Sequence, residues 1–258
     1  MLLRMQIKDE DITDAFCDGD VWAYRIGYSS QHTPPETPAP WFTIKWAMHE
    51  TIDKVKRKYP NANIWICLTD ENENYRKGVA TTATYKGGRI STKPYFWRKI
   101  RNAFYDDPRA IVSVNEEADD VMSKKLMESP YHACVTVDKD LKNTPGTHWN
   151  DSTGIGITVT PAMAYRNFYI QLLTGDQVDN IKGCPRIGKI TATALLAGCR
   201  TPEEYERVVG LTYAVAKGVD DPEARMIEMG QLLWMRRLDN EMWDLRANGF
   251  TTREIVGG

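Results

Sequence analysis

The stretch ANIWICLTD, residues 62–70, is a short apolar run that ends in an aspartate. Its length and its apolar, partly β-branched composition predict a buried strand. Three other stretches have the same character: DAFCDGD at 14–20, RAIVSVN at 109–115 and YHACVTVDKDL at 131–141. We expect these four stretches to be strands of one sheet.

Segments with helical spacing separate the predicted strands. VWAYRIGYS at 21–29 follows the first strand, WFTIKWAMHETIDKVKRKYP at 41–60 precedes the second, and EEADDVMSKKLMES at 116–129 follows the third. Alternating strands and helices imply right-handed crossovers and a mostly parallel sheet flanked by helices. The fold class predicted from the sequence is therefore α/β.

The second half of the chain is predicted to be helical, after a further strand or hairpin at GIGITVT, residues 154–160. Thr201, Pro202 and Glu204 form a good helix start signal. The expected helices are PAMAYRNFYIQLLTG at 161–175, TATALLAG at 191–198, TPEEYERVVG at 201–210 and one long closing helix at 221–245.

The composition is that of an ordinary globular chain, with 42% hydrophobic and 26% charged residues among 258. No apolar run approaches the roughly 18 residues of a membrane span, and the start MLLRMQIKDEDITD does not have the pattern of a signal peptide. These features predict a cytoplasmic protein with no membrane partner. We expect all five cysteines to be free thiols: Cys17, Cys67, Cys134, Cys184 and Cys199.

Charge is segregated along the chain, although the net charge is only −2. That net charge, taken alone, argues against a nucleic-acid partner. The stretch from Arg76 to Arg101, however, contains eight lysines and arginines and no acid. The average therefore hides a strongly basic segment.

Acidic residues gather at predicted strand ends and helix starts. In a parallel sheet, functional groups collect past the carboxyl ends of the strands. A single aspartate at such a place is commonly a cap or turn residue, and this alternative stays open for each one taken singly. The complete set is Asp18, Asp70, Glu117, Asp119, Asp120, Asp138, Asp140, Asp176 and Asp179.

If the fold brings these carboxylates together, their mutual repulsion would raise several pKa values unless cations are present. Oxygen ligands without histidine suit Mg²⁺ or Mn²⁺ and argue against zinc. Two such ions roughly 4 Å apart can activate a water and stabilise the leaving oxygen of a phosphodiester. The carboxylates therefore predict metal-dependent hydrolysis of phosphodiester bonds.

The stretch GDQVDNIKGCPRIGKITATALL, residues 175–196, has Gly183 and Gly188 on either side of Pro185. Glycines let backbone N–H groups approach a ligand, and the helix that starts near Gly188 points its positive end at an anion. This is the pattern of a helix–hairpin–helix loop, which grips a DNA backbone without reading bases. A plain connection between two helices is the alternative. Positive charge around the loop comes from Lys182, Arg186 and Lys189.

Taken in chain order, these motifs resemble those of the flap endonuclease and 5′–3′ exonuclease superfamily, whose nuclease core is a PIN-like α/β fold. The resemblance rests on FCDGD, LTDENENYRKGVATTATYKGGR, EEADD, VTVDKDLK and GDQVDNIKGCPRIG, and covers about residues 12–198. The closing segment GQLLWMRRLDNEMWDL is similar to that of short bacteriophage exonucleases. The chain therefore resembles that branch most, which implies the cytoplasm of a host cell.

The resemblance implies a role for each acidic residue. Two divalent ions, Mg²⁺ or Mn²⁺, are held by an inner set and a second set, and Asp138 and Asp140 are expected to be essential for catalysis. The second set is Asp176 with Asp179. The inner set is Asp18, Asp70, Glu117, Asp119, Asp120, Asp138 and Asp140.

The resemblance also implies how DNA is held. Lys86 and Arg76 match catalytic basic residues that sit on the scissile phosphate. The hairpin loop of relatives binds a K⁺ ion through backbone carbonyls, and that ion meets the DNA phosphate. The implied DNA contacts are Arg76, Tyr85, Lys86, Arg89, Lys182, Gly183, Arg186, Ile187, Gly188 and Lys189.

The acid-free segment matches the gateway past which the 5′ end is fed. We therefore predict a nuclease core over residues 1–160 that includes a basic gateway segment at 71–108. The helical part follows over 161–258, with the helix–hairpin–helix at about 161–198. Two features depart from the family pattern. Arg186 stands where a glycine is common, and the gateway is short, which favours degradation from an end over flap threading.

The expected function is that of a divalent-metal-dependent 5′→3′ exonuclease acting on duplex DNA with a 5′ end. Three alternatives stay open. The enzyme could act on RNA–DNA hybrids, as in primer removal during DNA replication, because phosphate contacts ignore the 2′-hydroxyl unless a side chain meets it. It could be a flap endonuclease proper. The third alternative is a non-catalytic DNA-binding scaffold. The carboxylates argue against it, because a protein that only binds DNA gains nothing from acidic residues near the phosphates.

Overall fold

The computed structural model describes residues 7–30, 39–88 and 92–245. The chain divides into two compact units, Met1–Glu73 with Ser91–Val159 and Asn74–Ile90 with Thr160–Gly258. Each unit has its own apolar core. Residues 74–90, expected in the nuclease core as part of the basic gateway segment, belong to the second unit.

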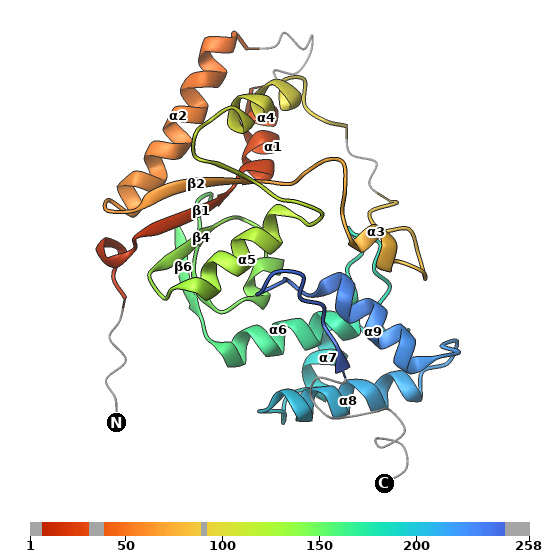
Figure 1. Cartoon of the computed structure of the whole chain (residues 1–258). Coiled ribbons are helices and arrows are strands. Elements are labelled where there is room, and N and C mark those ends of the chain that lie inside the picture. The colour runs from red at the N-terminus through yellow and green to blue at the C-terminus, as the bar shows by residue number, and fades with distance from the viewer. Residues whose placement is uncertain (1–6, 31–38, 89–91, 246–258) are drawn as a thin grey trace. The chain divides into compact units, whose positions relative to one another are not determined.

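The first unit is built on a six-stranded sheet with the strand order β3-β2-β1-β4-β5-β6 (Figure 1). The last two strands pair antiparallel and the other neighbours pair parallel, which confirms the predicted mostly parallel α/β fold. The strands are β1 (Asp14–Asp18), β2 (Asn63–Leu68), β3 (Ala110–Val112), β4 (His132–Val135), β5 (Gly146–Asn150) and β6 (Ile155–Val159).

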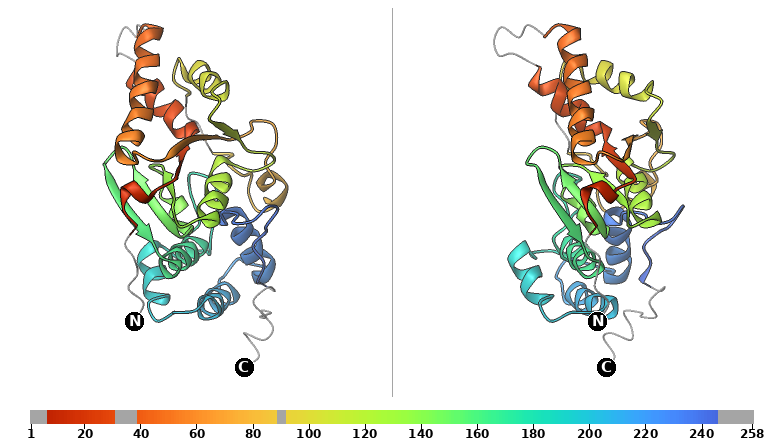
Figure 2. Two further views of the ribbon diagram at one scale, coloured as in Figure 1. Left: turned by 60° about the vertical axis from the view of Figure 1, so that its left-hand side comes forward. Right: turned by 90° about the vertical axis from the view of Figure 1, so that its left-hand side faces the viewer.

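Both faces of the sheet are covered by helices, as Figures 1 and 2 show. On β1, Ala15 and Cys17 pack against α1, α2 and α4, whereas Phe16 between them packs against α5. Burial on both faces explains why β1, β2 and β4 have continuous apolar sequences, whereas the edge strand β6 is mostly exposed. The helices of this unit are α1 (Gly19–Ser29), α2 (Trp41–Lys58), α4 (Trp97–Tyr105) and α5 (Ala118–Glu128), with short 3₁₀ helices at Asp9–Asp11 and Asp140–Asn143.

Strand β5 lies in a stretch for which the sequence predicts no strand. Its residues GTHWN have little strand propensity, but their backbone pairs with both β4 and β6. Pairing with neighbouring strands therefore outweighs local preference. Strand β4 ends at Val135, earlier than the predicted stretch 131–141, so Asp138 and Asp140 follow the strand.

The second unit is helical, as predicted, and surrounds a core to which Phe168, Leu172, Val209 and Met229 contribute. Thr201 caps α8 and forms the predicted capping box with Glu204. None of the helices in the described residues is long and apolar enough to cross a membrane. The helices are α3 (Arg76–Val79), α6 (Pro161–Thr174), α7 (Lys189–Leu195), α8 (Pro202–Ala214) and α9 (Pro222–Leu233).

The closing helix is shorter than the sequence predicts. Helix α9 ends at Leu233, and Trp234 has an extended backbone with φ −68° and ψ 126°, whereas one helix was expected over 221–245. The chain then folds back onto α9, so that a Cβ placed on Gly230 would lie 2.0 Å from a ring atom of Trp243. The glycine inside the helix thus provides room for the returning chain.

All five cysteines are buried free thiols, as expected for a chain without disulfides. His148 on β5 is also buried, at 4% exposure. Burial lowers the pKa of His148 to about 4, although the hydrogen bond between Nε2 and the Thr144 carbonyl (2.9 Å) opposes this shift. Because a carbonyl can only accept, Nε2 carries a hydrogen, and the lowered pKa leaves the ring neutral at pH 7.

This histidine makes the stability of the protein depend on pH. Below its ordinary pKa of about 6.5 the unfolded chain binds a proton that the folded chain does not bind until about pH 4. The free energy of unfolding should therefore fall by up to about 3 kcal/mol as the pH drops through this range. His148→Gln keeps a donor but does not titrate, so it should show a smaller fall. Urea unfolding of the wild type and of His148→Gln, at about pH 6.5 and about pH 4, measures this difference. An equal fall of the unfolding free energy in the two proteins would contradict the prediction.

Candidate functional site

Asp18 is the last residue of β1 and caps α1. Its side chain is 3% exposed, and it accepts hydrogen bonds from the Val21 N–H (2.9 Å) and the Thr136 hydroxyl (3.0 Å). Burial, together with the nearby carboxylates of Asp20 and Asp138, raises the pKa of Asp18 to about 7, although both hydrogen bonds oppose the shift. A carboxylate in such surroundings favours a nearby cation.

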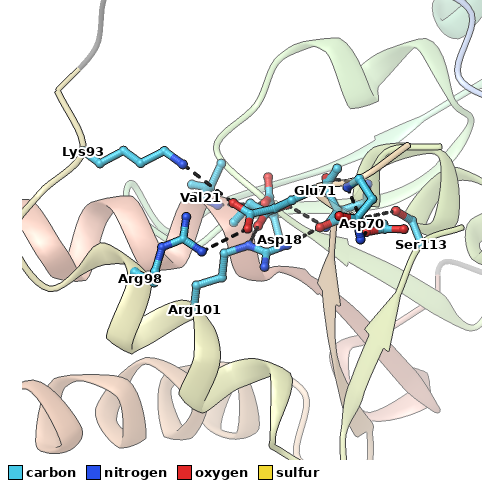
Figure 3. A network of polar contacts seen from close by, with 12 residues as sticks. Asp18, Val21, Asp70, Glu71, Lys93, Arg98, Arg101 and Ser113 are labelled. Carbon is cyan, nitrogen blue, oxygen red and sulfur yellow. Dashed lines mark hydrogen bonds and ion pairs between the residues drawn. The ribbon is translucent and has the colours of Figure 1, made fainter. Parts of the chain in front are cut away.

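Asp70 follows the neighbouring strand β2, and Figure 3 shows it beside Asp18 at the carboxyl edge of the sheet. Its N–H donates to the Ser113 hydroxyl (3.0 Å) beyond β3. Its Oδ1 accepts from the backbone and the side-chain amide of Asn72 (3.0 and 2.9 Å). These bonds hold Asp70, a half-buried residue, at the end of its strand.

Thr136 connects the carboxylates that follow β4 with the one that ends β1. Its hydroxyl donates to Asp18 and accepts from the N–H of Asp138 (3.0 Å), and the Asp138 carboxylate accepts from the N–H of Asp140 (2.8 Å). Sequence reasoning overlooked Thr136, because a threonine near a strand end has no distinguishing pattern. The one indication in the sequence is that Thr136 stands two residues before Asp138.

The acids at the start of α5 divide into two kinds. Glu117 and Asp120 form a capping box, in which the Asp120 carboxylate accepts from the Glu117 N–H (3.0 Å). Asp120 is fully buried at 0% exposure, whereas Asp119 is half-buried. Asp120 thus caps α5, and its role as a metal ligand stays a prediction.

The sheet order β2-β1-β4 brings Asp70, Asp18 and Asp138 to three adjacent strand ends. Within residues 7–30, 39–88 and 92–245, no three Asp, Glu, His or Cys side chains converge closely enough to hold one ion. The donor chemistry nevertheless fits a hard divalent cation, because the side chains at this edge are carboxylates. Burial is the main cause of the raised pKa of Asp18, and the carboxylates of Asp20 and Asp138 add to it.

Several cations of the basic segment pair with acids beside these strand ends (Figure 3). Arg101 is buried, and its guanidinium contacts the Asp20 carboxylate (3.1 Å) and the Thr69 carbonyl. Lys93 and Arg98 pair with Glu71 (3.7 and 3.2 Å). These three basic residues therefore neutralise acids within the first unit, a use that their spacing in the sequence does not indicate.

In the second unit, the loop between α6 and α7 is held by close contact of two glycines. Gly175 and Gly183 have positive φ (70° and 63°), and a Cβ on Gly183 would lie 2.4 Å from the Gly175 nitrogen. The backbones of Asp176 and Ile181 exchange two hydrogen bonds (2.9 and 2.7 Å). Arg186 has φ 65°, a left-handed conformation that glycine adopts more easily. This explains why the resemblance leads one to expect glycine at that position.

The Asp176 carboxylate binds backbone N–H groups of this loop. Its Oδ1 accepts from the N–H groups of Val178 (2.7 Å) and Asp179 (3.2 Å), and the residue is buried at 7% exposure. Around the loop, Lys182, Arg186, Gly188 and Lys189 are exposed and Ile187 is half-buried, whereas Gly183 is buried against Gly175. The exposed cations and backbone form a surface suited to phosphate contacts.

Tyr85, Lys86 and Asp179 lie together in the second unit. The Tyr85 hydroxyl donates to Asp179 Oδ2 (3.0 Å), and Lys86 Nζ lies 3.8 Å from the same oxygen. The Lys86 N–H donates to the Asp179 carbonyl (2.9 Å). Arg89, another predicted DNA contact, lies outside the described residues.

Arg76 does not reach the surface. It is 1% exposed, and its guanidinium donates to the carbonyls of Leu232 (2.9 Å) and Trp234 (2.8 Å) at the end of α9. The last carbonyls of a helix lack partners within the helix, so a buried arginine stabilises them. This burial corrects the expectation that Arg76 contacts a scissile phosphate, because its guanidinium closes α9 instead.

Comparison with known proteins gives a match in structure but none in sequence. No family model and no curated protein matches the chain. The bacteriophage T5 D15 protein co-crystallized with metal ions has a TM-score of 0.60 and 13% identity, over 84% of this chain and 89% of that chain. A complex of the T5 D15 flap endonuclease with DNA and metal ions gives the same values.

The T5 5′-exonuclease with bound zinc has a TM-score of 0.56 and 14% identity, over 84% of this chain and 99% of that chain. At these identities the likeness shows the fold. It confirms, at that level, the resemblance to flap endonucleases and 5′–3′ exonucleases that the motifs predict. The chain thus has the fold of the bacteriophage T5 nucleases.

Proposed function

We propose that the protein is a divalent-metal-dependent nuclease that hydrolyses phosphodiester bonds from the 5′ end of duplex DNA. The observation that carries this proposal is the row of carboxylates at three adjacent strand ends, Asp70, Asp18 and Asp138, around a buried acid with a raised pKa. The fold that holds them is shared with T5 proteins whose structures contain metal ions and, in one case, DNA.

The carboxylates of the first unit would hold Mg²⁺ or Mn²⁺. When bound, such an ion lowers the pKa of its water and stabilises negative charge on a phosphate. As the ligands we propose Asp18, Asp70, Asp138, Asp140 and Asp119, with Glu117 at the start of α5. The assignment of Asp176 and Asp179 to a second ion stays a prediction from the resemblance.

The second unit supplies groups that bind the DNA backbone. Lys182, Arg186 and Lys189 are exposed around the hairpin loop and can contact successive phosphates without reading bases. A K⁺ ion at the loop carbonyls is part of the same proposal. Lys86, next to Tyr85, would stabilise the negative charge that develops on the phosphate during cleavage.

Cleavage of flaps is the second candidate, and it is favoured by the likeness to the T5 D15 flap endonuclease. RNA–DNA hybrids are a further substrate class, because phosphate contacts do not distinguish the two sugars. One experiment separates these: the same 5′-labelled strand is presented in a blunt duplex, a flap and an RNA–DNA hybrid, with Mg²⁺ or with EDTA. The proposal expects the blunt duplex to be shortened from its 5′ end with Mg²⁺ and to stay intact with EDTA.

Removing the carboxylates that follow β4 tests the assignment of the site. Asp138→Ala and Asp140→Ala should each abolish cleavage while leaving DNA binding, measured by fluorescence anisotropy, close to that of the wild type. Asp53→Ala, which removes an exposed aspartate on α2, is the matched control and should cleave normally. Degradation of duplex DNA by Asp138→Ala at the wild-type rate would show that the site lies elsewhere.

Substitutions at two glycines of the hairpin loop test whether the shape of this loop is needed for DNA binding. Gly183→Ala should destabilise the loop and weaken DNA binding, because its Cβ would meet Gly175 N at 2.4 Å and its φ is 63°. A Cβ on Gly188 meets nothing within 4 Å, so Gly188→Ala should keep the wild-type melting temperature. We expect the unfolding free energy to fall by about 1–3 kcal/mol for Gly183→Ala. Equal melting temperatures for the two variants would exclude this account.

A further inference from the structure

One buried glutamate connects α9 with the segment that carries Lys86. Glu228 is 8% exposed, and its Oε1 accepts from the N–H groups of Thr81 and Thr82, both at 2.6 Å. Its Oε2 accepts from the Thr82 hydroxyl. Burial raises the pKa of Glu228, but these hydrogen bonds outweigh it and hold the pKa below its ordinary value. The side chain is therefore a charged acceptor for three donors of one short stretch.

Ala80 and Tyr85 pack against the apolar core, and between them the stretch is held mainly by polar contacts. Thr81 and Thr84 are exposed, and Thr82 and Ala83 are only half-buried. Few apolar groups are therefore available to fix the backbone, and removing Glu228 should loosen the stretch while the core of the unit stays folded.

The chain from Thr84 to Lys86 is held by hydrogen bonds to the hairpin loop. Asn180 Nδ2 donates to the Thr84 carbonyl (2.9 Å), and the Tyr85 hydroxyl donates to Asp179 Oδ2 (3.0 Å). The Lys86 N–H donates to the Asp179 carbonyl (2.9 Å). Lys86 is thus held on a short span with Glu228 at one end and the loop residues at the other.

The backbone of Lys86 shows that it is restrained. Its φ is 56°, in the left-handed region that residues with a Cβ rarely adopt. A conformation of this kind persists only when its surroundings determine it, and it occurs often at functional sites. The Gly87 N–H donates to the Thr84 carbonyl (3.0 Å), so this turn, the residues before it and the contact with Asp179 together restrain Lys86.

We propose that Glu228 is a positioning residue that, through Thr81 and Thr82, holds Lys86 where its ammonium group can meet the phosphate under attack. This inference rests on the proposed nuclease function. Asp179 is closer to Lys86, but it is also a predicted metal ligand, so a substitution there would confound two roles. Glu228 has no such second role, and it offers a clean test.

The test compares Glu228→Ala, Lys86→Ala and the double variant in steady-state cleavage of a 5′-labelled duplex with Mg²⁺, over a range of duplex concentrations. Loss of the lysine should lower kcat by about 10²–10³-fold, as for removal of one charge-stabilising group. Loss of the glutamate should lower kcat by roughly 10- to 100-fold through misplacement of that lysine, with little change in KM. The double variant should be no slower than Lys86→Ala alone.

Two further variants separate positioning from general stability. Glu228→Gln keeps an oxygen for both N–H groups and an amide that can bond the Thr82 hydroxyl, so it should recover most of the lost rate. Glu203→Ala removes an exposed carboxylate on α8 and should behave like the wild type. If Glu228→Ala does not fold, Thr82→Val removes a single donor to Glu228. Its smaller loss of kcat should disappear when Lys86 is also replaced.

The outcomes distinguish this inference from the function on which it rests. A wild-type protein that cleaves none of the substrates overturns both. If the wild type cleaves but the losses of Glu228→Ala and Lys86→Ala multiply in the double variant, Glu228 acts independently of the lysine and only the positioning role is overturned. A Lys86→Ala variant with full activity, or a Glu228→Gln variant as slow as Glu228→Ala, overturns it as well.

Discussion

Parallel pairing of β1 with β2 on one side and β4 on the other determines where the acids of the first unit lie. Because the three strands run in one direction, their carboxyl ends meet at one edge, and an aspartate follows or ends each of them. The central one, Asp18, accepts two hydrogen bonds, but burial, with a smaller contribution from its acidic neighbours, raises its pKa to about 7. A nearby cation would favour the charged form of this carboxyl, and the proposed chemistry supposes such a cation.

Carboxylates in this protein hold backbone N–H groups in both units, and at the sheet edge Asp18 does so while it ends a strand. Some lie at the sheet edge, where their oxygens can serve a metal. Others hold backbone: Asp120 closes the capping box of α5, Asp176 binds the N–H groups of its own loop, and Glu228 anchors Thr81 and Thr82. An acidic motif can therefore contain carboxylates that hold backbone beside those proposed here as metal ligands.

The sequence predicts the sheet and most helices because their apolar residues recur with clear periods and their caps are explicit. The prediction from sequence fails where a contact between residues far apart in the chain determines the local structure. Strand β5 forms because two neighbours pair with a stretch of weak strand propensity. Helix α9 stops at Leu233 because the chain returns to place Trp243 on Gly230, although helical spacing continues beyond that point. Arg76 is a basic residue in a basic motif, yet its guanidinium donates hydrogen bonds to the last carbonyls of α9.

The primary structure by itself determined the class of fold, the strand ends that carry aspartates and the loop with Gly183, Pro185 and Gly188. These follow from local rules, since periodicity, turn residues and composition act over a few neighbouring positions. Only the tertiary structure decided which acids hold backbone, that Arg76 is buried, and that Glu228 and Asp179 restrain the segment of Lys86. Those contacts join residues far apart in the chain, and burial and hydrogen bonding between them depend on the packing of whole elements.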